Sequence, residues 1–100
     1  MKTIKTIIAK LDEYSKKGIC THCICTWKFT QGNYFEKDDT SAKMLEKFKS
    51  FKQLTITTVG EDRLYIEMNG LGKPFDFNES DKKDNENYEV IIALISEFIQ

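Results

Sequence analysis

Apolar side chains recur at helical spacing near the start of the chain. The positions that repeat every three or four residues are Ile4, Ile7, Ile8, Leu11 and Tyr14. Lysine and acidic residues fill the opposite face, which is the pattern of an amphipathic helix packed on a core. Lys16 and Lys17 suit the negative end of such a helix, and Gly18 can end it. The pattern predicts a helix over residues 3–17.

The pattern changes over residues 19–29 to β-branched and aromatic side chains, which favour a strand. In one uninterrupted strand, alternate side chains share a face. The inward face would carry Thr21, Cys23, Cys25, Trp27 and Phe29. We therefore expect Cys23 and Cys25 to be buried, and Trp27 to anchor the core between sheet and helices. After a turn, residues 34–37 could return as a short second strand.

A second amphipathic segment follows this region. Asp38 and Asp39 can cap a helix that runs to Ser50, because carboxylates stabilise helix N-termini. The apolar face of that helix would consist of Met44, Leu45, Phe48 and Phe51. We expect this face to join the core.

Two clear strand patterns occupy the middle of the chain. Residues 54–59 are rich in threonine, isoleucine and valine, and residues 64–68 alternate between apolar and polar side chains. A turn at residues 60–63 separates them. Asn69-Gly70 is a strong hairpin signal, and residues 75–77 can add a short edge strand.

The C-terminal part of the chain is first polar and then strongly apolar. Residues 78–87 predict a mobile acidic loop. Asp84 or Asn85 can then cap a last helix, whose apolar residues cover nearly its whole circumference. Because one side of a small sheet cannot cover so much apolar surface, we expect part of this helix at a homodimer interface. Val90 and Leu94 lie off its main apolar stripe and are the candidate interface residues.

The order α-β-β-α-β-β-(β)-α predicts a single small α+β domain over residues 1–100. Its architecture would be two layers, with an antiparallel sheet of 4–5 strands and three helices packed mainly on one face. Folds of this kind host many functions, so the architecture does not identify one.

Charge and composition restrict the choice of partners. The chain has 100 residues and a formal net charge of −1, so no overall field attracts nucleic acid or anionic membrane. Arg63 is the only arginine among 15 basic residues, and lysine lacks the planar fork that reads guanine or phosphate bidentately. Nucleic-acid binding is therefore only a second alternative function.

The distribution of charged and apolar residues also bears on the cellular compartment of the protein. Lys5 and Lys10 interrupt the apolar positions of the first helix, and no apolar run reaches the roughly 18 residues of a membrane span. We expect a cytoplasmic protein with no membrane contact, whose three cysteines stay free and reduced. Frequent lysine, isoleucine and asparagine are typical of an AT-rich gene, which suggests a bacterial or phage origin.

All the cysteines and the one histidine fall within six residues: Cys20, His22, Cys23 and Cys25. These are zinc-ligand types, but in a strand they point to both faces and cannot close one tetrahedron. His22 could activate the Cys20 thiol, although no orienting residue is defined. We expect no metal, no cofactor and no catalytic residue.

The acidic segment is the other candidate site. Five carboxylates there can form a docking surface for a protein with a basic surface: Asp76, Glu79, Asp81, Asp84 and Glu86. The sequence thus favours a non-catalytic protein-binding module, such as a small bacterial or phage inhibitor, immunity-type or adaptor protein. The alternative is a small enzyme or ligand-binding domain with a pocket near Cys20 and His22.

Overall fold

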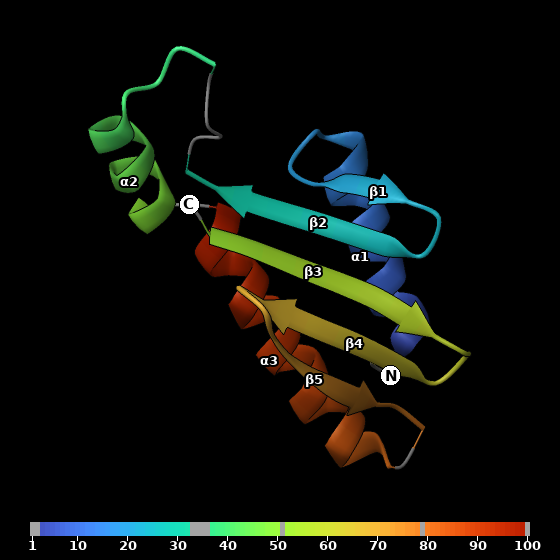
Figure 1. Cartoon of the computed structure of the whole chain (residues 1–100). Helices are drawn as coiled ribbons and strands as arrows, with labels where there is room; N and C mark the ends of the chain where they lie inside the picture. Colours follow the sequence, from blue (N-terminus) through green and yellow to red (C-terminus); the bar gives the residue numbers. More distant parts are fainter. Residues whose placement is uncertain (1–2, 33–36, 51, 79, 100) are drawn as a thin grey trace.

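The computed structural model describes residues 3–32, 37–50, 52–78 and 80–99 (Figure 1). It is an α+β domain in which a five-stranded antiparallel sheet carries helices on one face. The elements, in chain order, are α1 (Ile4–Lys16), β1 (Thr21–Cys23), β2 (Thr26–Gln31), α2 (Ser41–Ser50), β3 (Lys52–Val59), β4 (Arg63–Met68), β5 (Leu71–Asp76) and α3 (Asp81–Ile99). This order confirms the predicted fold class.

Helix α1 begins at a capping box. The Thr3 hydroxyl accepts a hydrogen bond from the Thr6 amide at 3.4 Å, and the Thr6 hydroxyl accepts one from the Thr3 amide at 3.4 Å. These reciprocal bonds join the N-cap to the first turn of the helix, where the Thr6 amide also donates to the Thr3 carbonyl at 3.1 Å. The helix ends before Gly18, whose φ of 76° is in the left-handed region. The helix predicted over residues 3–17 is therefore confirmed.

The sheet is a meander in which each strand pairs with the next, in the order β1-β2-β3-β4-β5. The turn between β4 and β5 is the predicted Asn69-Gly70 hairpin, and both residues have positive φ. The strand expected at 75–77 is longer than predicted and starts at Leu71. The strand expected at 34–37 falls mostly on residues outside the described ones.

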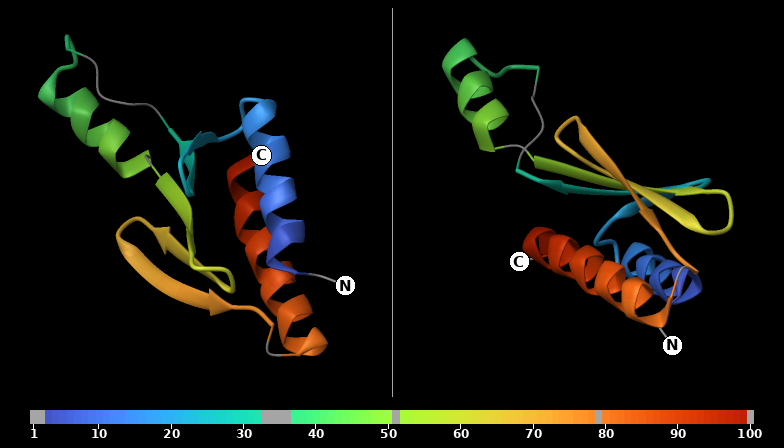
Figure 2. Two further views of the ribbon diagram at one scale, coloured as in Figure 1. Left: turned by 90° about the vertical axis from the view of Figure 1, so that its right-hand side faces the viewer. Right: turned by 90° about the horizontal axis from the view of Figure 1, so that it is seen from below.

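The core lies between the sheet and the pair of helices α1 and α3, which Figure 2 shows together on one side of the strands. The fully buried side chains of the strands are Phe29, Leu54, Ile56 and Leu64, and those of the helices are Ile7, Leu11, Ile91 and Ile95. They alternate along the strands and recur at helical spacing along the helices, as expected for two packed layers.

Helix α2 does not join that layer. Figure 2 shows it beyond the end of the sheet, on the side opposite to α1 and α3. Two of its predicted core residues, Met44 and Leu45, are exposed. Its N-cap is Thr40, whose hydroxyl accepts from the Lys43 amide at 3.2 Å, and not Asp38 or Asp39.

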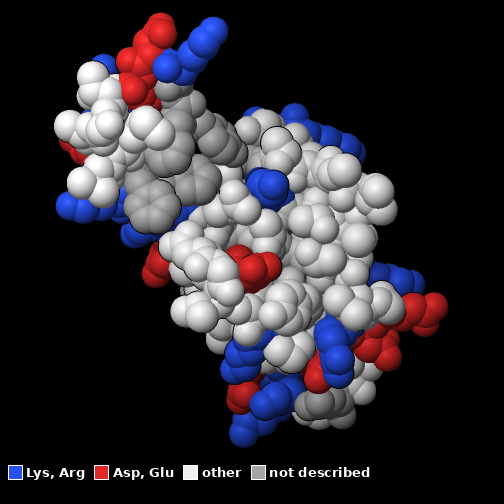
Figure 3. All heavy atoms as spheres, viewed as in Figure 1, with Lys and Arg blue, Asp and Glu red and all other residues white. Residues whose placement is uncertain are grey.

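In the described ranges, no helix covers the length of the sheet face opposite to α1 and α3. Figure 3 views the molecule from this side and shows few charged side chains over the strands and more around the rim. By strand alternation, the residues on this open face include Thr26, Lys28, Thr55, Thr57, Tyr65 and Glu67.

Two boundaries differ from the predictions. Residues 19–29 do not form one strand, because the chain turns back on itself at Ile24 and Cys25 to make the β1–β2 hairpin. The mobile loop expected at 78–87 is also wrong from Asp81 onward, where α3 begins. Ser80 caps this helix by accepting from the Lys83 amide at 3.2 Å. Asp81 and Asp84 in the first turn suit its positive end.

No helix in the described ranges is long and apolar enough to cross a membrane.

Trp27 is buried between the sheet and α1, as predicted from its position. Replacing Trp27 by Ala should lower the free energy of unfolding by roughly 3–5 kcal/mol, because the lost contacts leave a cavity. Chemical denaturation of the Trp27→Ala variant tests this, with Leu71→Ala, at an exposed position, as the control. An unfolding free energy for Trp27→Ala within about 1 kcal/mol of the wild-type value would contradict the packing described here.

Candidate functional site

The β1–β2 hairpin ends in a two-residue turn that is unusual in sequence. Cys23 and Thr26 are the last paired residues, so Ile24 and Cys25 form the turn. Ile24 has a φ of 58° and is 91% exposed. Positive φ at the first turn position but not at the second, Cys25, corresponds to type II′ geometry, in which glycine is the usual first residue. A β-branched residue there is strained. We call residues 23–25 the hairpin tip.

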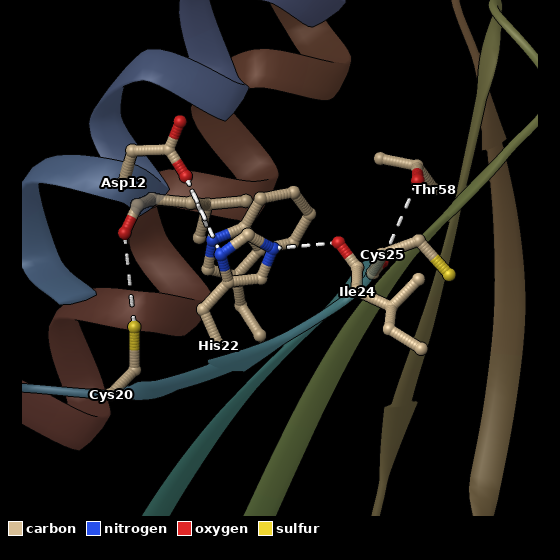
Figure 4. A network of polar contacts seen from close by, with 8 residues as sticks. Asp12, Cys20, His22, Ile24, Cys25 and Thr58 are labelled. Carbon is tan, nitrogen blue, oxygen red and sulfur yellow. Dashed lines mark hydrogen bonds and ion pairs between the residues drawn. The ribbon is translucent and has the colours of Figure 1, made fainter.

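Both carbonyl groups of the turn are held by neighbouring elements (Figure 4). The Ile24 carbonyl accepts a hydrogen bond from His22 Nε2 at 2.8 Å. The Cys25 carbonyl accepts from the Thr58 amide of β3 at 2.9 Å, and the Thr58 hydroxyl contributes a longer contact of 3.5 Å. These bonds fix the backbone that follows the Ile24 Cα atom, and the pairing of Cys23 with Thr26 fixes the backbone before it. The hairpin tip is therefore held by one local bond, from His22, and by one tertiary bond, from β3.

The histidine that supports the tip is itself held by the core. Its ring stacks on Trp27, with centroids 4.4 Å apart and planes at 5°. His22 Nδ1 lies 3.9 Å from Asp12 Oδ1, and the same oxygen accepts from Trp27 Nε1 at 3.2 Å. Asp12 of α1 thus links the helix to both strands of the hairpin.

The three thiols have different environments. Cys20 is buried, and its thiol lies 3.8 Å from the Leu11 carbonyl, to which it donates. Burial raises the pKa of the Cys20 thiol, and the charge of Asp12 raises it further. Cys23 and Cys25, in contrast, are exposed. The prediction that these two are buried is wrong, because the turn at Ile24 removes them from the strand alternation on which it depended.

This arrangement does not favour nucleophilic chemistry at Cys20. A raised pKa lowers the thiolate fraction, and the thiolate is the reactive form. His22 Nε2 donates to the Ile24 carbonyl, so this nitrogen is already engaged. A cavity of about 650 Å³ lies by the start of α1 and includes Thr3, Lys5 and Asp62 in its lining, but neither Cys20 nor His22. Within the described ranges, no three His, Cys, Asp or Glu side chains converge as a metal site would need.

The five acidic residues predicted as a docking surface lie in different environments. Asp76 forms an ion pair with Arg63 at 2.5 Å. Asp84 is only 3% exposed, and its Oδ2 accepts from the Asn78 amide at 2.9 Å. Its burial removes it from any docking surface. Asp81 and Glu86 are exposed on α3, and Glu79 lies outside the described residues.

The two residues predicted at a dimer interface also differ from each other. Val90 is exposed on α3. Leu94 is partly buried and packs against the core. A role for either in self-association stays a prediction.

The chain was compared with protein-family models, curated proteins and solved structures, and none of the three comparisons gave a match. The function must therefore be argued from the surfaces described above.

The exposed and buried thiols give a direct test of the hairpin. In the folded protein, a thiol-specific reagent should label Cys23 and Cys25 rapidly and Cys20 only on unfolding, because a buried thiol with a raised pKa is protected from attack. Mass spectrometry of labelled peptides would measure the three rates. Slow labelling of Cys23 and Cys25 together with fast labelling of Cys20 would contradict the position of the turn.

Proposed function

We propose that this protein is a non-catalytic protein-binding module that inserts the Ile24 side chain into an apolar pocket of another protein. Small inhibitors, immunity-type proteins and adaptors act in this way, by covering part of a partner. The observation that carries the proposal is the exposed, left-handed isoleucine at the hairpin tip.

The conformation of Ile24 costs conformational free energy, and the fold could avoid this cost with glycine at the same position. A non-glycine residue in the left-handed region costs on the order of 1–3 kcal/mol. Glycine at this position would relieve the backbone strain, and it would also leave no apolar side chain exposed to solvent. Strained residues that the surrounding structure holds in place occur preferentially at functional sites. The retained cost is therefore an argument for a role outside the folded chain.

The rigidity of the tip also suits binding. Ordering a flexible loop on binding reduces affinity, whereas a preformed loop avoids that cost. The Ile24 and Cys25 carbonyls are both held by hydrogen bonds, so the isoleucine is already presented. Burying one such side chain in a partner contributes about 1.5–3 kcal/mol.

Three further features bear on the proposal. The raised pKa of Cys20 does not favour an enzyme that uses this thiol. The surface thiols Cys23 and Cys25 suit a reducing compartment such as the cytoplasm. The exposed carboxylates Asp81 and Glu86 on α3 stay candidates for contact with a basic protein surface.

Replacing Ile24 by Asn should separate binding from stability. Asparagine tolerates positive φ, so the free energy of unfolding should stay the same or rise. Binding to the partner should weaken by about tenfold or more, because the apolar anchor is lost. Affinity capture from extracts of the native host, quantified by mass spectrometry, would identify proteins that prefer the wild type, and titration would then give the dissociation constants.

The matched control is Leu71→Asn, since Leu71 is 83% exposed in a different hairpin. It should bind the same partner as the wild type does. If the captured proteins bind Ile24→Asn as tightly as the wild type, the hairpin tip is not the binding site.

A further inference from the structure

The open face of the sheet has a charge pattern that is independent of the hairpin tip. Lys28 of β2 pairs with Thr55 of β3, and Thr55 pairs on its other side with Glu67 of β4. One positive and one negative side chain thus lie on either side of the central strand, about 10 Å apart since neighbouring strands are about 4.8 Å apart. Among the described residues, neither Lys28 nor Glu67 forms an ion pair.

Apart from Lys28 and Glu67, the side chains near the centre of this face are polar and uncharged. The Thr26 and Thr57 hydroxyls hydrogen-bond to each other at 3.1 Å across β2 and β3. The Tyr65 ring lies over Gly72, in the space where a Cβ atom would stand, so the aromatic ring lies along the sheet. A face of this shape can approach another sheet closely, because two sheets pack face to face at about 10 Å.

We propose that the open face binds a second copy of this chain in a symmetric face-to-face dimer. The two-fold axis would be parallel to β3 and midway between the two sheets. It would place Lys28 of each copy opposite Glu67 of the other, and Thr55 opposite Thr55. A two-fold interface brings the same patch of both subunits together, so the patch must complement itself. A two-fold axis across the strands would instead place Lys28 against Lys28. The charge pattern therefore selects both the occupant and its orientation.

The position of α2 agrees with this occupant. The helix lies on the open-face side, beyond the end of the sheet (Figure 2). Its Met44 and Leu45 side chains are exposed. A second sheet against the open face would lie next to them and could cover part of this apolar surface. The proposal does not depend on the role of Ile24, because it uses a different surface.

Charge reversal tests the proposed pairing. Analytical ultracentrifugation of the full chain over a range of concentrations should show a dimer for the wild type. Lys28→Glu and Glu67→Lys should each raise the dimer dissociation constant by tenfold or more, because like charges would face each other. The double variant K28E/E67K should dimerise again. An equimolar mixture of the two single variants should form a heterodimer, since all opposed charges then have opposite sign.

Val90→Lys is the control on the helix side. Val90 is exposed on α3, so this variant should fold and dimerise as the wild type does. A wild type that stays monomeric at millimolar concentration would overturn the proposal. If Val90→Lys dissociates the dimer and Lys28→Glu does not, the interface lies on α3, and the proposed pairing of the open faces is overturned. Failure of the single-variant mixture to associate would exclude the Lys28–Glu67 pairing.

Discussion

The indole of Trp27 is the contact on which the first half of the structure depends. It is buried on the helix-facing side of β2, stacks on the His22 ring of β1, and donates to Asp12 of α1. A single side chain thus connects the helix, the short edge strand and the longer strand, beside the backbone pairing of β1 with β2. Aromatic side chains with a polar group suit this role, because they bury a large area and still form a directed hydrogen bond.

The unusual hairpin tip follows from this contact. With His22 stacked on Trp27, the Nε2 atom is directed at the Ile24 carbonyl, and β3 supplies the Thr58 amide to the Cys25 carbonyl. Because Cys23 pairs with Thr26, the hairpin closes with Ile24 and Cys25 as its two turn residues. Tight turns of this length need a positive φ at the first turn position, so Ile24 takes a conformation that a β-branched residue disfavours. The strain at the tip is thus maintained by tertiary contacts.

The two faces of the sheet differ for a simpler reason. Helices α1 and α3 lie on the same side of the sheet and leave its threonine-rich side open (Figure 2).

Elements with strong local signals could be predicted from the sequence, and elements set by distant contacts could not. The helical spacing of Ile4, Ile7 and Leu11 and the Asn69-Gly70 turn are local, and both predictions are confirmed. The break at Ile24 has no glycine, proline or asparagine to mark it. The contacts that hold the turn come from His22, which stacks on Trp27, and from Thr58. The acidic segment is the candidate docking site that the sequence predicts, and the burial of Asp84 could not be predicted from charge alone. The predicted burial of Cys23 and Cys25 is wrong because it assumed a continuous strand through Ile24. The apolar face of α2 suggested core packing, because sequence periodicity does not show whether a partner layer is within reach.

The proposed binding role requires that the free protein hold Ile24 exposed and left-handed before any partner is present. Solution NMR of the isolated chain measures this directly, through the nuclear Overhauser effect between the amide and α protons of Ile24. A positive φ brings these protons close together, so the account predicts a strong intraresidue cross-peak for Ile24, comparable with that of Asn69, which has a φ of 50°. A weak cross-peak, like those of residues in the extended strands, would contradict it.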